Sequence, residues 1–272
     1  MAFGFIAATI VLAGILTGLL MALFGIGGGA FIVPVLDATF ARLPGVAPPP
    51  FKLAVLASLV AIGLGSSWRA LQVWRRHEFE RDALGLLIGG ALPGTLIGVA
   101  LVSSLAGDLL RLAFAAALAL LGLWTGFGQP HPAAALQDSR RRRNRLLAIG
   151  ALSGLASSMF GLGGATLLMP LLTMRAGFST AAAATLSIVF VFVASLQSLA
   201  MYGAGLLAGV ASLAGVQPIH LQLVALLTVA ALLSQQLFLR LMGDMPDRLR
   251  RTLLAAYLII AAAWLVREVA LR

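Results

Sequence analysis

Long apolar runs separated by short arginine clusters constrain this chain more than any other feature. Six runs have about the 20 residues that a helix needs to cross a bilayer; they lie near 53–74, 84–105, 110–127, 181–203, 219–239 and 252–267. Of the 272 residues, 61% are apolar and only 10% are charged, against roughly 25% charged residues in a soluble domain. This composition cannot cover a soluble enzyme with polar surface, so it predicts an all-α polytopic membrane protein.

The sequence contains two copies of one motif. Residues 14–36 and 150–172 share the pattern Gly-x-x-x-Gly, then Phe-Gly-x-Gly-Gly, then Pro, at an offset of 136 residues, half of the chain. The same offset relates Leu-Ala-Gly-Asp at 105–108 to Leu-Met-Gly-Asp at 241–244. The chain therefore reads as a duplication, with a first membrane repeat (1–128), a basic cytoplasmic linker (129–145) and a second membrane repeat (146–272).

Each half begins with a glycine-interrupted apolar stretch, at 5–36 and at 146–174. A Phe-Gly-x-Gly-Gly sequence is not expected to form a straight, continuous helix, because each glycine lowers the stability of the helix. Irregular backbone at membrane depth is tolerated only where it is buried in protein or lines a cavity. We therefore expect each stretch to be re-entrant and to be followed by three spanning helices.

The arginine clusters favour inverted halves. The first-half loop at 75–81 is basic whereas its counterpart at 211–217 is uncharged, and the order reverses for 106–111 and 240–251. Loops on the cytoplasmic side carry the excess of Lys and Arg. Inverted halves place every cluster on that side and both termini outside, whereas parallel halves would place 240–251 outside. We interpret the net charge of +10 as this orientation signal and not as a nucleic-acid surface, because the clusters lack interleaved aromatic residues.

Acidic residues are expected to stay out of the spans. All nine fall in loops or at segment ends: Asp37, Glu78, Glu80, Asp82, Asp108, Asp138, Asp244, Asp247 and Glu268. Proton-coupled carriers typically hold an ionisable group within the membrane, so coupling through a buried acid is not expected. We predict no catalytic residues, no metal site and no cofactor. Arg69 is the one cation inside a span and away from its ends, and we expect it to snorkel to the cytoplasmic face.

The two glycine-rich tips are the candidate substrate site. In transporters with inverted repeats and broken helices, the site lies near the midplane at the repeat interface. Backbone N–H groups and a half-helix N-terminus there favour an anion. The tip candidates are Gly25, Gly27, Gly28, Gly29, Gly161, Gly163 and Gly164, with polar candidates Ser66, Ser195, Gln197 and Gln235. Other serines and threonines in or beside the spans, among them Ser58, Ser153, Ser157, Thr166 and Ser187, are each more typical of helix-to-helix hydrogen bonds. The pairs Gly14/Gly18 and Gly150/Gly154 have the spacing of helix packing.

The duplicated motif with a basic central loop resembles the TauE/SafE sulfite exporter family, also called the 4-toluene sulfonate uptake permeases. The resemblance covers nearly the whole chain. It implies a permease for sulfur-containing anions such as sulfite, sulfonates or sulfoacetate in the bacterial cytoplasmic membrane. One departure is Ala165, which stands where the first copy has Gly29.

The leading hypothesis is a secondary transporter that moves a small sulfur oxyanion by alternating access of the two repeats. An anion channel, with the tips as a filter, and a permease for a non-sulfur organic anion are the alternatives. An intramembrane serine protease is disfavoured because the three histidines, His77, His131 and His220, lie in loops or at a segment boundary and not as a base within a span. The expected partners are the anionic substrate and the lipid bilayer, with a homodimer as an option and no nucleic acid.

Overall fold

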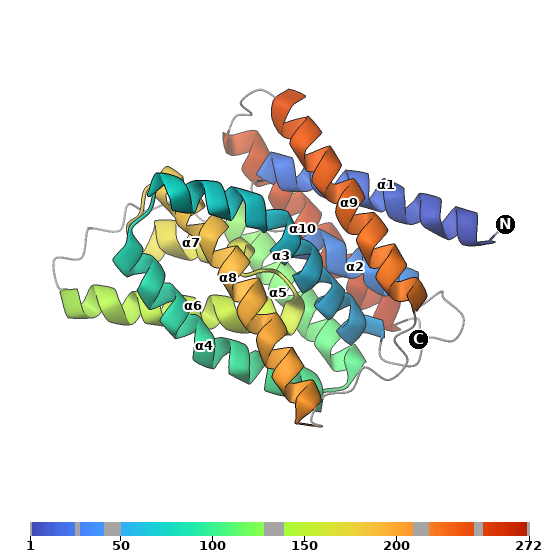
Figure 1. The fold of residues 1–272 in the computed structure, drawn as a ribbon, viewed down its shortest axis with the longest axis horizontal. Helices are drawn as coiled ribbons and strands as arrows, with labels where there is room; N and C mark the ends of the chain where they lie inside the picture. The colour runs from blue at the N-terminus through green and yellow to red at the C-terminus, as the bar shows by residue number, and fades with distance from the viewer. Residues whose placement is uncertain are drawn as a thin grey trace.

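The computed structural model describes residues 2–24, 28–40, 50–127, 139–208, 218–241 and 247–270. These ranges form ten helices and contain no strand (Figure 1). The prediction of an all-helical protein is confirmed. The helices are α1 (Ala2–Phe24), α2 (Gly29–Phe40), α3 (Pro50–Arg76), α4 (Arg81–Ser104), α5 (Gly107–Phe127), α6 (Ser139–Phe160), α7 (Ala165–Arg175), α8 (Thr180–Leu207), α9 (Pro218–Leu241) and α10 (Asp247–Ala270).

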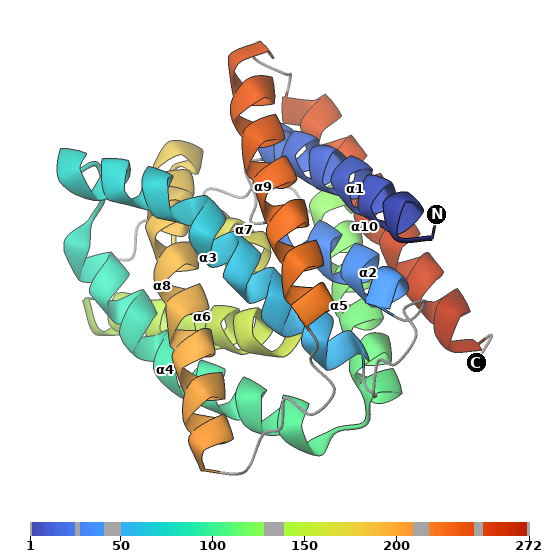
Figure 2. The same cartoon turned by 45° about the vertical axis from the view of Figure 1, so that its right-hand side comes forward.

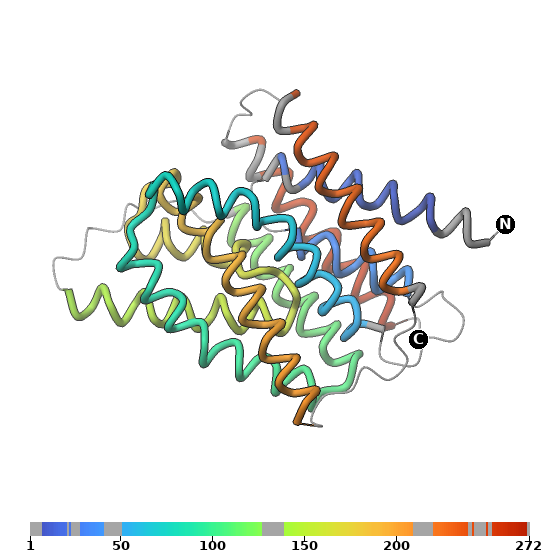
Figure 3. The backbone as a smooth tube through the Cα atoms, viewed as in Figure 1, coloured from blue at the N-terminus to red at the C-terminus, as the bar shows by residue number. Residues whose placement is uncertain are grey.

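Six of these helices are long and apolar enough to cross a membrane, namely α3, α4, α5, α8, α9 and α10. They coincide with the six predicted runs. The remaining four helices form two pairs, α1–α2 and α6–α7, each interrupted at its glycine motif as expected. In Figure 1 the short helix of each pair turns back along the longer one, and the tube in Figure 3 follows the chain through the second break, from α6 into α7.

The two halves pack against each other through an exchanged set of helix pairs. Helix α6 packs on α4 of the other half, and its counterpart α1 packs on α9. Helices α3 and α8 pair with each other, as do α5 and α10. Corresponding helices also run in opposite directions in Figures 1 and 2: α3 rises toward the upper left, whereas α8 descends from there. The inverted arrangement of the halves, and the membrane face that each helix end meets, stay predictions.

Small residues allow the closest of these contacts. A Cβ at Gly150 or Gly154 of α6 would clash with the backbone of α4 at Leu87 or Ala91, and a Cβ at Gly94 of α4 would clash with the carbonyl of Ala151. In the other half, Gly14 and Gly18 of α1 meet α9 in the same way. Because glycine has no side chain, helix backbones approach where any other residue would hold them apart. The packing role predicted for these glycine pairs fits the geometry.

The arginine-rich helix ends gather at one side of the molecule, where α3 ends and α4 and α6 begin (Figure 1). Arg142 of α6 donates a hydrogen bond to Glu80 (2.7 Å), and this bond raises the pKa of the Arg142 guanidinium above its ordinary value. The same guanidinium lies 5.6 Å from the centre of the Phe178 ring. These contacts tie the start of α6 to the segments that precede α4 and α8. Residues 128–138, most of the predicted linker, lie outside the described ranges.

Candidate functional site

The two glycine tips meet in the middle of the fold. A Cβ added at Gly29, the first residue of α2, would clash with the carbonyl of Gly161 and with the backbone of Leu162. The expected convergence of the tips is therefore seen for Gly29 with Gly161. Gly25 and Gly27 lie outside the described residues.

At the first tip, hydrogen bonds occupy the carbonyl groups of Gly28 and Ala30 at the start of α2. The carbonyl of Gly28 accepts hydrogen bonds from the N–H groups of Phe31 and Ile32, both at 2.9 Å. Pro34 has no N–H, so it leaves the carbonyl of Ala30, four residues earlier, without its helical partner. The Tyr257 hydroxyl of α10 donates to that carbonyl at 3.2 Å. Sequence reasoning missed Tyr257, although a tyrosine in an apolar span usually needs a partner for its hydroxyl.

The second tip is a left-handed turn that only glycine adopts readily. Gly161, Gly163 and Gly164 have φ values of 64°, 67° and 80°, a region that other residues rarely visit. The turn is enclosed on two sides: Ser58 and Ile62 of α3 adjoin Gly161 and Gly163, and Phe190 and Val191 of α8 adjoin Gly164 and Gly163. Any side chain here would be both strained and crowded.

Carbonyl groups at the second break are occupied by donors. The carbonyl of Ser157 accepts from the N–H of Gly161 (2.9 Å), that of Ser158 from the Tyr202 hydroxyl (2.9 Å), and that of Gly161 from the Ser58 hydroxyl (2.8 Å). By contrast, α7 begins after Gly164 with no side chain capping its N–H groups. The first N–H groups of a helix have no acceptor within it. The break therefore offers spare donors and few spare acceptors, which suits an anion and not a cation.

Buried hydroxyl groups without a partner lie on α7 and on the two helices that pack against it, α6 and α8. The side-chain oxygens of Ser153, Ser157, Thr166 and Ser187 are buried and have no hydrogen-bond partner among the described residues. Ser153 and Ser157 lie one turn apart on α6, and the carbonyl of Ser153 adjoins Gly164. Thr166 is the second residue of α7, and Ser187 lies one turn before Phe190 on α8. Buried polar groups normally have partners, so the four unpaired hydroxyls make the second tip the candidate ligand site.

The other predicted polar residues do not gather at the tips. Ser66 donates to the carbonyl of Ile62 in its own helix (2.8 Å). Gln197 donates to the carbonyl of Ile88 (3.4 Å) and so joins α8 to α4. Gln235 is buried where α9 packs on Gly18 of α1. Ser195 is buried beside Gly63 between α8 and α3, and its hydroxyl has no partner among the described residues.

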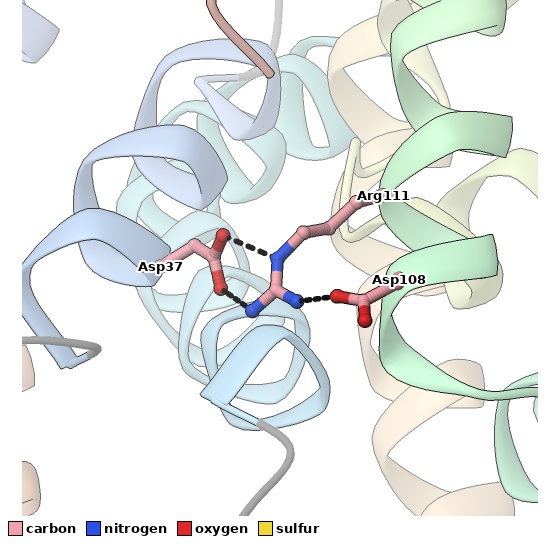
Figure 4. Close-up of polar contacts among 3 residues, drawn as sticks. All are labelled: Asp37, Asp108 and Arg111. Atoms are coloured by element: carbon pink, nitrogen blue, oxygen red, sulfur yellow. Dashed lines mark hydrogen bonds and ion pairs between the residues drawn. The ribbon is translucent and has the colours of Figure 1, made fainter. Parts of the chain in front are cut away.

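One carboxylate, that of Asp37, is buried, although it lies near the end of its segment as the sequence indicated. It lies in the last turn of α2 and is fully buried. Figure 4 shows its carboxylate against the guanidinium of Arg111 on α5, whose Nε and Nη2 each donate at 2.8 Å. Arg111 also contacts Asp108, one turn earlier. Because the partner is 74 residues away, the pattern along the chain gave no sign of this ion pair.

In the part of the chain that the structure describes, no three His, Cys, Asp or Glu residues cluster together. Six apolar helices, two broken helix pairs and a donor-rich tip define a multi-pass membrane protein with a buried polar site. The chain belongs to the TauE/SafE sulfite exporter family, whose model matches residues 10–265.

Three relatives carry the description of a probable membrane transporter protein. The protein from Haemophilus influenzae is 24% identical over 94% of both chains. The one from Xylella fastidiosa is 30% identical over 58% of this chain and 59% of its own, and the one from Methanocaldococcus jannaschii is 24% identical over 61% of each. No solved structure matches the chain. The protein is thus a multi-pass membrane protein of a transporter family, which is not a class of enzymes.

Proposed function

We propose that the protein is a secondary transporter (permease) for small sulfur-containing anions such as sulfite, sulfonates or sulfoacetate, in the bacterial cytoplasmic membrane. The observation that carries this proposal is the second break, where the start of α7 has no side-chain cap, four buried hydroxyls on α6, α7 and α8 have no partner, and neighbouring carbonyls are occupied. The description of the family as sulfite exporters supports the sulfur oxyanion as substrate.

Neutral donors are well suited to a substrate that must also leave. The N-terminus of a helix supplies about half a positive charge through N–H groups that already point outward. Hydroxyl groups add hydrogen bonds without a fixed counter-charge. A sulfite or sulfonate group presents three oxygen acceptors, so it can use the amides of Ala165 and Thr166 together with the hydroxyls of Ser153 and Ser157.

The two glycine tips differ in the number of hydroxyl-bearing residues beside them, and this difference favours a single anion site at the second tip. At the offset of 136 residues, the positions of Ser153, Ser157 and Thr166 are occupied in the first copy by Thr17, Met21 and Ala30. Two of the three hydroxyls are therefore absent there. The first tip also begins its helix against the backbone of the second one. We assign the first tip to closing the site and the second to binding the anion.

Alternating access of the two repeats is the mechanism we propose. Its support is the exchanged packing, in which each broken pair rests on a spanning helix of the other half, α1 on α9 and α6 on α4. The opposite directions of corresponding helices in Figures 1 and 2 fit inverted repeats. A movement of one half relative to the other would then expose the second tip to either side.

The test is transport by the purified full chain in liposomes. We expect saturable uptake of radiolabelled sulfite, stimulated by unlabelled sulfite or sulfoacetate on the opposite side, and thermal stabilisation of the detergent-solubilised protein by the same anions. Ohmic single-channel currents without counterflow would instead show an anion channel. Stabilisation and uptake limited to carboxylates would refute the assignment of sulfur anions.

A further inference from the structure

Arg69 is a cation inside a membrane-spanning helix without a counter-charge. It lies within the apolar span Phe51–Arg76 and is half-buried. In the described part of the chain, no carboxylate pairs with it and no hydrogen bond reaches it. Arginine in such a position is rare and usually either pairs or serves a function. The guanidinium of Arg69 is therefore available to an anion.

The position of Arg69 on α3 connects it with the second tip. Ser58, Ile62, Gly65 and Arg69 follow one another at spacings of four, three and four residues, which places them on one face of the helix. Ser58 donates to the Gly161 carbonyl, and a Cβ at Gly163 would lie 2.8 Å from the Ile62 side chain. Arg69 thus shares the face of α3 that holds the second tip.

The exposed face of α3 lies elsewhere. Its large apolar residues with high exposure, Val60, Leu64, Trp68 and Leu71, form a separate row around the helix. Gly65, one turn before Arg69, faces Leu232 of α9 at 3.3 Å from its added Cβ. Arg69 therefore belongs to the side of α3 that is turned toward the protein and not to the row that meets lipid.

Along α3, Arg69 lies between the arginine-rich end of the helix and the residues that contact the second tip. Arg69 lies seven positions after Ile62, and this spacing corresponds to a rise of about 10 Å along an α-helix. Arg69 lies on the side of Ile62 toward the arginine-rich end of α3. An anion that moves between that end and the second tip along this face of α3 would therefore pass the guanidinium.

We propose that Arg69 contacts the transported oxyanion between the arginine-rich face and the second tip, and so sets the apparent affinity for the substrate. This inference rests on the proposed function. The planar guanidinium matches two oxygens of a sulfite or sulfonate group with two parallel hydrogen bonds. The anion in turn supplies the counter-charge that the helix lacks. Lysine would keep the charge but lose the paired geometry.

The experiment compares Arg69→Gln and Arg69→Lys with Arg75→Gln in the full chain reconstituted into liposomes. Arg75 is the control because it is exposed in the last turn of the same helix. With radiolabelled sulfite supplied at the arginine-rich face, we expect Arg69→Gln to raise the half-saturating concentration about tenfold or more, since hydrogen bonds to charged groups are the stronger ones. Arg69→Lys should fall between Arg69→Gln and the unchanged protein, and Arg75→Gln should change little.

The outcomes separate this inference from the proposed function. If the unchanged protein neither transports nor binds sulfite, the proposed function fails. If it does, and Arg69→Gln has the same half-saturating concentration as Arg75→Gln, Arg69 only reaches toward the membrane interface and the inference is overturned. If Arg69→Gln fails to fold, Arg69→Lys is the deciding variant. An unchanged half-saturating concentration of sulfite in Arg69→Lys would assign the residue to folding. A higher half-saturating concentration with a normal melting temperature would support the contact with the anion.

Discussion

The guanidinium of Arg111 holds both carboxylate oxygens of Asp37, at 2.8 Å each, and so joins the short helix α2 to α5 (Figure 4). Arg111 is 2% exposed and Asp37 is not exposed. Removal of one member of such a pair leaves a buried charge without a partner. The pair therefore fixes one end of the first broken helix pair. In the second copy the corresponding residue is Thr173, whose hydroxyl bonds within its own helix.

Substitution of Arg111 tests this link. We expect Arg111→Leu to lower the free energy of unfolding by about 3–5 kcal/mol, because Asp37 is then buried unpaired. The double variant Asp37→Leu with Arg111→Leu should recover much of that loss. The measurement is the unfolding transition of the detergent-solubilised protein. If the single and double variants lost the same free energy of unfolding, packing and not the ion pair would account for the destabilisation.

Glycines on α4 provide a matched test of helix packing. Gly94→Ala should destabilise the protein by about 1–3 kcal/mol, because the new methyl group meets the carbonyl of Ala151. Gly89→Ala is the control, since nothing lies within 4 Å of a Cβ there, and alanine favours a helix by up to about 1 kcal/mol over glycine. Melting temperatures of the two variants should move in opposite directions. Similar shifts would contradict the close approach of α4 and α6.

The unpaired hydroxyls should matter for the substrate more than for folding. We expect Ser153→Ala with Ser157→Ala to raise the half-saturating concentration of sulfite about tenfold while the melting temperature stays level or rises, because unpaired buried hydroxyls are unfavourable. Ser198→Ala is the control, as its hydroxyl is buried but bonded to the Ala194 carbonyl (2.8 Å). Loss of stability in the double variant without a change in sulfite transport would assign Ser153 and Ser157 to helix packing.

The absence of cysteine from the chain makes the membrane topology directly measurable. Single cysteines at Glu78, after α3, and at Ser179, before α8, should both resist a membrane-impermeant maleimide until the membrane is permeabilised. A cysteine at Ser104, at the end of α4, should react from outside. Parallel halves would place the positions of Glu78 and Ser179 on opposite sides, so labelling of only one of them would refute inversion.

The sequence was sufficient to predict the elements that depend on local composition. Six spans follow from length and hydropathy, and the ends of α1 at Phe24 and of α6 at Phe160 follow from the glycines after them, which weaken a helix. The meeting of Gly29 with Gly161 could be anticipated because the motif occurs twice. These features can be predicted without knowing which helix faces contact one another.

The direction of individual polar side chains could not be predicted. Gln197 and Gln235 occupy apolar spans, as a substrate site would require, yet they lie against α4 and α1. Ser153 and Ser157 were more typical of helix-to-helix bonds and instead remain unpaired beside α7. Rotation of a helix by one residue changes the face by 100°, and only tertiary packing decides it.

The contact of Gly29 with Gly161 has a mechanical consequence. The contact is formed by backbone atoms alone, so no change of side-chain rotamer can open it to a solute. Passage between the halves would therefore need the two broken helix pairs to part as rigid bodies. A β-carbon at position 29 would overlap the Gly161 carbonyl, so any other residue there would force the start of α2 away from the second tip.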